Sequence, residues 1–243
     1  MSATALHARP SGGYDTKLAH ARGLLRSTAT AHGNGVVQAT SLGAEDMVIT
    51  DLISRANLPI SLGTLDTGLL HAETLALLPR IEARYGLRVE AMQPGREAVI
   101  QFVARHGERS MFESIAQRKA CCALRKLEPL ARLLAGKRAW ITGLRREQSG
   151  QRANVPFTEA QADGCVKVNP LADWTWGDVW HYIATNEVPY NPLHDQFYPS
   201  IGCAPCTRAI SLGEDMRAGR WWWEDEAAKE CGLHIKNAEG ATA

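Results

Sequence analysis

Short apolar runs that alternate with helical segments constrain the fold of this chain more than any other feature. Within residues 45–55, for example, Met47, Val48 and Leu52 are spaced as on one face of a helix. Strands that alternate with helices of this length predict a parallel sheet covered on both faces, and therefore an α/β fold. The predicted strands lie at residues 35–40, 58–65, 87–92 and 138–142.

Composition divides the chain into three parts. Residues 1–15 are polar and contain Gly, Pro and Ser, so we expect a flexible N-terminal arm. Residues 16–220 are expected to form the α/β domain, with a further helix over 174–186. Residues 221–243 begin with three tryptophans, which fit core packing better than a stacking platform, and end in a tail rich in Glu, Lys and Ala. We expect this C-terminal segment to be mobile.

Charge and hydropathy exclude several classes of protein. The chain has 27 Lys and Arg against 26 Asp and Glu, a net charge of +1, which argues against a general nucleic-acid binder. It contains no run of about 18 apolar residues, so we expect no membrane-spanning helix. Its N-terminus does not have the pattern of a secretory signal, and we expect a cytoplasmic protein. In that reducing compartment, six cysteines are better explained as ligands, nucleophiles or small apolar residues than as disulfides.

Polar turns follow the first two predicted strands. Residues 40–46 contain Ser41, Gly43 and Asp46 between a strand and a helix, where backbone N–H groups can hold an anion. Residues 65–68, Leu-Asp-Thr-Gly, follow the next strand. Neither turn matches the P-loop or the dinucleotide fingerprint, and an ordinary capped turn explains each one alone. Together they indicate a shared nucleotide site.

Arginines are concentrated after the fourth predicted strand. Arg145, Arg146 and Arg152 lie within eight residues among Ser, Gln and Gly, and can grip an anion through paired N–H groups. A solvated charged loop explains the same run. Further cations, which lie close to cysteines in the sequence, are Arg125, Lys126, Arg208, Arg217 and Arg220.

Four cysteines occur in two pairs. Cys203 and Cys206 are separated by Ala-Pro, and Cys121 and Cys122 are adjacent at the head of an apparent helix. Two pairs can bind zinc or an iron–sulfur cluster, and Cys203 and Cys206 alone can be a redox dithiol. Adjacent side chains on a helix diverge, so they converge poorly on one ion, whereas a [4Fe–4S] cluster offers each thiolate a separate iron. The spacing therefore favours the cluster over zinc.

The remaining two cysteines differ in context. Cys165 is predicted to be a buried strand residue without a role. Cys231, followed by Gly-Leu-His, is either an inconsequential tail residue or a nucleophile that visits both a substrate and a reducing partner.

Seven segments in order resemble the assimilatory adenylyl-sulfate reductases, the iron–sulfur branch of the phosphoadenylyl-sulfate/adenylyl-sulfate reductase family. The resemblance covers most of the chain, and its cysteine motifs are the most specific part. The matching segments are TSLGAED (40–46), LDTG (65–68), CCALRK (121–126), GLRREQS (143–149), YNPLH (190–194), SIGCAPCT (200–207) and ECGLH (230–234).

The resemblance implies a PP-loop-like adenine-nucleotide-binding fold and a set of functional residues. Cys231 would be the nucleophile, and its S-sulfocysteine intermediate would be cleaved by thioredoxin or glutaredoxin to release sulfite. The [4Fe–4S] cluster would be held by Cys121, Cys122, Cys203 and Cys206. The adenylate would be held by Ser41, Gly43, Asp46, Leu65, Asp66 and Gly68, and the anionic group by Lys126, Arg145, Arg217 and Arg220.

The same resemblance bears on substrate and partners. Intact cysteine pairs are typical of the branch that reduces adenosine 5′-phosphosulfate, although some members also accept the 3′-phosphorylated nucleotide. Because the chain ends at Ala243 without a fused thioredoxin-like domain, we expect a separate reductant. We expect neither a membrane nor a nucleic acid as a partner, and a homo-oligomer is possible. The alternatives are an ATP-dependent PP-loop ligase or thiolase, and a non-catalytic iron–sulfur sensor or zinc-stabilised module.

Overall fold

A six-stranded sheet forms the centre of the computed structural model, which describes residues 1–211 and 213–225. The strand order is β3-β2-β1-β4-β6-β5, and neighbouring strands run parallel except β5 and β6. The strands are β1 (Val36–Thr40), β2 (Ser61–Leu65), β3 (Val89–Met92), β4 (Ala139–Ile141), β5 (Thr158–Ala160) and β6 (Val166–Val168).

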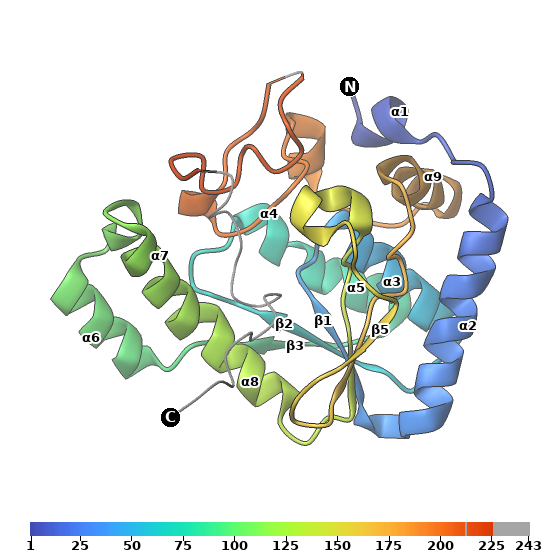
Figure 1. Cartoon of the computed structure of the whole chain (residues 1–243), viewed down its shortest axis with the longest axis horizontal. Helices are drawn as coiled ribbons and strands as arrows, with labels where there is room; N and C mark the ends of the chain where they lie inside the picture. The colour runs from blue at the N-terminus through green and yellow to red at the C-terminus, as the bar shows by residue number, and fades with distance from the viewer. Residues whose placement is uncertain (212, 226–243) are drawn as a thin grey trace.

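Helices cover both faces of this sheet (Figure 1). The longer ones are α2 (Tyr14–His32), α3 (Ala44–Arg55), α5 (Leu77–Tyr85), α6 (Arg96–His106), α7 (Ile115–Cys122), α8 (Glu128–Leu134) and α9 (Trp176–Asn186). Two short helices are α1 (Ala3–His7) and α4 (Ala72–Leu75). Single helical turns are η1 (Gly33–Gly35), η2 (Ser110–Phe112), η4 (Arg146–Gln148), η5 (Gly150–Arg152), η6 (Pro192–Gln196) and η7 (Ala204–Cys206), and η3 (Ala123–Leu127) is a π-helical segment.

The central strand β1, Val-Val-Gln-Ala-Thr, is buried on both faces. Val36 packs in the core formed with α2, α3 and α9, whereas Val37 packs with Leu133 of α8 on the opposite face. Successive side chains of a strand point to opposite faces, so one strand contributes to two cores. On the α8 face, a Cβ atom at Gly63 would lie 2.4 Å from Leu133 Cδ1, and the glycine therefore allows α8 to approach β2 closely.

A buried carboxylate ties three helices together on the first face. Asp51 of α3 accepts hydrogen bonds from Tyr182 Oη of α9 at 2.7 Å and from Tyr85 Oη of α5 at 3.0 Å. Arg55 Nε donates to the same carboxylate at 2.6 Å. These bonds satisfy a charge that would otherwise be costly to bury, and they fix α3, whose N-terminus reaches the candidate site.

The predicted α/β fold is confirmed, with two differences in detail. All four predicted strands are present, whereas β5 and β6 were not among them. Cys165, predicted to be a buried strand residue, is buried and immediately precedes β6. The expected position of Cys121 and Cys122 at the head of a helix is wrong. They end α7, and the π-helical segment η3 joins α7 to α8.

The N-terminal residues differ from the expected flexible arm. Helix α1 packs on α9, and Ala3 N donates to Asp195 Oδ1 at 2.7 Å. The Ser11 N–H donates to Asp178 Oδ1 at 2.7 Å, and Lys17 forms an ion pair with the same carboxylate. Burial by itself would raise the pKa of Asp178, but these bonds and that of the Thr175 N–H outweigh it and lower the pKa to about 2. Composition could not reveal these partners, which lie more than 150 residues away.

The C-terminal segment begins inside the core. Trp221 is buried in the cysteine-rich cluster and Trp223 packs against that cluster, as core packing requires, while Trp222 is exposed. The rest of the segment, including Cys231, lies outside the described residues. No helix within residues 1–211 and 213–225 is long and apolar enough to cross a membrane.

Candidate active site

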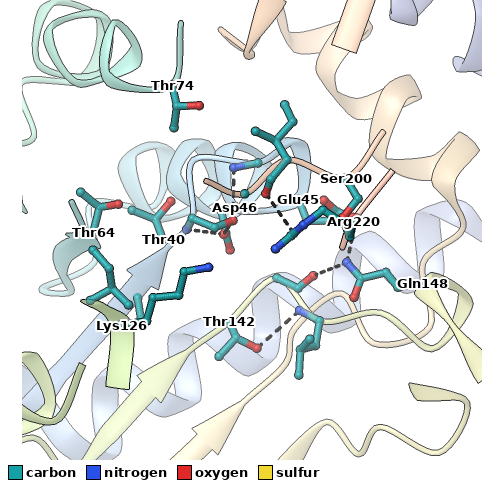
Figure 2. A pocket seen from close by; sticks show the side chains of 18 of the residues that line it. Thr40, Glu45, Asp46, Thr64, Thr74, Lys126, Thr142, Gln148, Ser200 and Arg220 are labelled. Carbon is teal, nitrogen blue, oxygen red and sulfur yellow. Dashed lines mark hydrogen bonds between the residues drawn. The ribbon is translucent and has the colours of Figure 1, made fainter. Parts of the chain in front are cut away.

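A cavity of about 220 Å³ opens at the carboxyl ends of β1, β2 and β4. Thr40 ends β1, Leu65 ends β2 and Thr142 follows β4, so the parallel topology brings the three strand ends to one edge. Figure 2 shows the side chains of Thr40, Thr142 and Lys126 around the same space. Of the ten predicted substrate-binding residues, seven line the cavity: Ser41, Gly43, Asp46, Leu65, Lys126, Arg217 and Arg220.

The turn at 40–46 is held by Asp46. Ser41 donates both its N–H and its hydroxyl to Asp46 Oδ2, each at 2.6 Å (Figure 2). Gly43 is the N-cap residue of α3 and provides no side chain, so the positive end of the helix faces the cavity without a side-chain cap. A helix N-terminus of this kind favours a bound phosphate or sulfate.

Asp46 is a buried carboxylate with an unusual proton affinity. Burial raises its pKa to about 6, although the hydrogen bonds from Ser41 act in the opposite direction. Its other oxygen, Oδ1, has no hydrogen-bond partner among the described residues. A Cβ atom at Gly143 would lie 2.6 Å from this oxygen, so glycine is required where the loop after β4 passes α3.

Arg145 does not line the cavity, and this differs from its predicted role in binding an anion. Its side chain is fully buried, with Nε donating to Glu45 Oε1 at 2.9 Å and Nη1 donating to Glu147 Oε2 at 2.8 Å. Nη1 also donates to the Trp174 carbonyl at 3.2 Å. The Arg145 guanidinium is therefore already occupied by protein groups, and it braces the loop after β4 against α3.

Gln148 and Arg152 also line the cavity. Sequence reasoning missed Gln148, and it named Arg152 only as part of the arginine run, without assigning it to the substrate. Gln148 Nε2 donates to Glu45 Oε1 at 3.0 Å, and its Oε1 accepts a hydrogen bond from Arg152 Nη1 at 2.7 Å. The run of three arginines was a sufficient signal for a cationic loop. Which arginine faces the cavity depends on the two short turns η4 and η5, and the sequence pattern does not predict them.

Asp66 and Gly68 also lie off the cavity, contrary to their predicted role. Asp66 accepts hydrogen bonds from the Gly68 N–H and from Gln93 Nε2, and so it shapes the turn after β2. The residue between them, Thr67, lines the cavity, and its hydroxyl lies 3.3 Å from Cys203 Sγ. This turn therefore connects the larger cavity to the cysteines.

The four paired cysteines meet in space although 80 residues separate the pairs in the chain. All four are buried and line one small cavity together with Arg118, Arg125 and Lys126. Hydrogen bonds hold the second pair against the turn after β2, since Ala204 N donates to the Leu69 carbonyl at 2.7 Å. None of the five described cysteines forms a disulfide, and Cys165 packs elsewhere, against α8.

The chemistry of these donors fits a polynuclear metal group. Burial raises the pKa of Cys121 and raises that of Cys206 to about 11, so without a cationic group these thiols are protonated at neutral pH. Among the described residues, no group of three or more His, Cys, Asp or Glu side chains is placed to hold a metal ion. Four thiols that surround a shared space are the donor set of a [4Fe–4S] cluster, which takes one thiolate per iron.

The cysteine cavity and the larger cavity have a common wall. Lys126 and Cys203 line both, and Lys126 lies in the π-helical segment that follows Cys122. Segments of π-helix are frequent at functional sites because they reorient side chains within a helix. Arg217 and Arg220 add positive charge to the lining of the larger cavity. The Arg220 guanidinium lies 4.6 Å from the centre of the Trp221 ring.

Comparisons with known proteins agree with this geometry. Residues 35–209 match the phosphoadenosine phosphosulfate reductase domain family. The chain is 57% identical over 202 residues to a protein of Allochromatium vinosum named adenosine 5′-phosphosulfate reductase, covering 83% of this chain and 79% of that one. A protein of Neisseria meningitidis serogroup A with the same name is 56% identical over 198 residues, or 81% of each chain.

Solved structures show the same architecture. The crystal structure of phosphoadenylyl-sulfate reductase from Candida auris, in a phosphate complex, is 31% identical with a TM-score of 0.66, and the match covers 78% of this chain and 90% of that one. The Candida glabrata FMN adenylyltransferase with FMN and an ATP analogue has a TM-score of 0.54, covering 94% of this chain and 81% of that one. At 12% identity, this second similarity shows the fold alone.

Proposed function

The chain belongs to the phosphoadenosine phosphosulfate reductase domain family, and from this premise we propose that it reduces adenosine 5′-phosphosulfate to sulfite and AMP in sulfate assimilation. One observation carries the proposal. The cavity at the strand ends shares Lys126 and Cys203 with the cavity lined by four cysteines. The relatives named adenosine 5′-phosphosulfate reductase, at 48–57% identity, support the choice of substrate.

The proposed reaction proceeds in two steps. The Cys231 thiolate attacks the sulfur of the sulfate group, an S–S bond forms, and the bond between that sulfur and the phosphate oxygen of AMP breaks. AMP leaves with the electron pair, and the enzyme carries an S-sulfocysteine. A dithiol protein, thioredoxin or glutaredoxin, then attacks Cys231 Sγ, releases sulfite and restores the Cys231 thiolate as its own second thiol closes a disulfide.

Cations in the larger cavity support the first step. Both substrate and leaving group are anionic, and fixed positive charge stabilises the charge that develops on the phosphate oxygen. We assign this role to Lys126, Arg217 and Arg220, which line the cavity together with Cys203. Figure 2 shows the Lys126 side chain extending into the cavity. The N-terminus of α3 and the turn at 40–46 would hold the adenylate.

We assign a [4Fe–4S] cluster to Cys121, Cys122, Cys203 and Cys206. Arg118, Arg125 and Lys126 surround these cysteines, and positive charge there would favour an anionic cluster. When bound, the cluster would supply an electrostatic influence on the cavity, because the two thiol steps need no single-electron carrier. The buried thiols, none of them in a disulfide among the described residues, are in keeping with a cytoplasmic enzyme.

A second candidate substrate is the 3′-phosphorylated nucleotide. The 31% identical Candida auris structure is named a phosphoadenylyl-sulfate reductase, and this similarity favours testing both nucleotides. The cysteine quartet favours adenosine 5′-phosphosulfate, because members of the family that use the other nucleotide often lack both pairs.

The deciding experiment measures sulfite release from the two nucleotides in parallel, under anaerobic conditions with reduced thioredoxin. We expect faster release from adenosine 5′-phosphosulfate, as judged by kcat/KM. Incubation without thioredoxin should leave a sulfonate adduct on Cys231, detected by peptide mass spectrometry, and Cys231→Ser should abolish sulfite release. An active enzyme with no adduct on Cys231 would rule out the intermediate.

A further inference from the structure

His194 lies in the wall of the larger cavity without a hydrogen-bond partner for its ring. It belongs to η6, and its side chain is almost completely buried, with 7% of the residue exposed. Neither Nδ1 nor Nε2 has a hydrogen-bond partner among the described residues. Buried polar atoms in proteins are nearly always paired, so an imidazole with two unpaired nitrogens needs an explanation.

Aromatic rings, rather than hydrogen bonds, set the position of this imidazole. The rings of Trp176 and Trp180 pack edge-on against it, with centroids 5.9 and 5.2 Å away. The backbone N–H of His194 donates to the Asn191 carbonyl at 3.0 Å and fixes the backbone of the turn. The ring is therefore held in place by aromatic packing and by the backbone of the turn.

The surroundings of the ring keep it neutral. Burial lowers the pKa of His194 to about 4, although the carboxylate of Glu45, the backbone of Tyr198 and the carboxylate of Asp195 act in the opposite direction. A neutral imidazole has one N–H donor and one nitrogen acceptor. Such a pair suits an oxygen atom of a ligand, either a hydroxyl group that both donates and accepts or a phosphate oxygen that accepts.

We propose that His194 is a nucleotide-binding residue, whose ring forms a hydrogen bond with an oxygen atom of the adenylate in the larger cavity. This inference rests on the proposed function, which places a sulfonucleotide there. The oxygen belongs either to the ribose or to the 5′-phosphate, and the two are separated by comparing adenosine with AMP as ligands.

The test uses the full chain with His194→Phe and His194→Gln, and His181→Phe as the matched control. His181 packs edge-on against Tyr14 at 4.9 Å and is not part of the cavity wall. Calorimetry gives Kd for AMP and for adenosine, and thermal unfolding gives the stability of the ligand-free proteins. We expect His194→Phe to weaken AMP binding about tenfold without lowering Tm, because it removes a buried group that has no partner in the free protein.

The outcomes separate a binding role from a structural one. An equal loss of adenosine affinity assigns the contact to the ribose, whereas a loss confined to AMP assigns it to the phosphate. Unchanged AMP affinity in both His194 variants would overturn the inference and leave the proposed function intact. A wild-type chain that binds neither AMP nor adenosine would overturn both. His181→Phe should match the wild type in Kd, and an equal loss there would also count against a specific role of His194.

Discussion

The Arg145 guanidinium donates to the Glu45 carboxylate at 2.9 Å and so joins the loop after β4 to the first turn of α3. Arg145 is fully buried, and Glu45 also forms part of the cavity wall. Burial would raise the pKa of Glu45, but the charge of Arg145 and the hydrogen bonds from Gln148, the Glu45 backbone and Arg145 together outweigh it and lower the pKa below its usual range. The pair therefore stays ionised at neutral pH and sets the distance between two sides of the site.

Arg145→Ala should destabilise the protein by about 3–5 kcal/mol, because it leaves a buried carboxylate without its partner. Urea unfolding of the ligand-free chain measures the change. Arg132→Ala is the control, since Arg132 and Glu128 form an exposed pair whose removal should cost less than about 1 kcal/mol. If the two variants lose the same stability, the buried pair does not brace the fold.

Gln148 should act on nucleotide binding through Arg152. Its amide uses both ends, since Nε2 donates to Glu45 and Oε1 accepts from Arg152. Arg152→Ala should raise KM about tenfold with little change in kcat, as expected when a contact to the bound nucleotide is lost. Gln148→Ala should raise KM less and should add little in the Arg152→Ala background. Additive effects in the double mutant would show that the two side chains act independently.

The cysteine quartet predicts the metal content. Cys203→Ala or Cys206→Ala should remove most of the iron and acid-labile sulfide from anaerobically purified protein, because each would supply one of four ligands. Cys165→Ala is the matched control, being a buried cysteine that packs against α8, and it should retain the wild-type iron content. Iron retained after substitution of Cys203 would contradict the proposed ligand set.

Asp46 predicts a pH dependence of stability. Its pKa is about 6 in the folded protein and lies near 3.8 when the chain is unfolded, so the folded state binds more protons between these values. The contribution of Asp46 to stability therefore falls as the pH rises from about 4 to about 6. Relative to Asp46→Asn, the wild type should gain on the order of 2 kcal/mol between about pH 7 and about pH 4.5. Urea unfolding of both proteins at the two pH values measures this, and parallel pH profiles would contradict it.

Periodicity and motif spacing located several of the loops that line the cavity. Residues 40–46 and Leu65 follow strands, and the carboxyl ends of parallel strands necessarily share one edge of the sheet. Asp66 and Gly68 were assigned to the cavity by the same reasoning, but they shape the turn that presents Thr67 instead. A motif locates a loop, whereas the direction of each side chain within it depends on local hydrogen bonds.

The sequence by itself determined the parallel α/β fold and the strand ends that line the cavity, because these depend on repeating patterns along the chain. The spacing of the cysteines also showed that four of them occur as two pairs. Only the tertiary structure decided that Arg145 braces the fold while Arg152 faces the cavity, and that His194 lies in its wall. These choices depend on partners far apart in the sequence, such as Glu45 and Arg145, 100 residues apart. No local pattern records which of several similar side chains is buried against the protein and which lines the cavity.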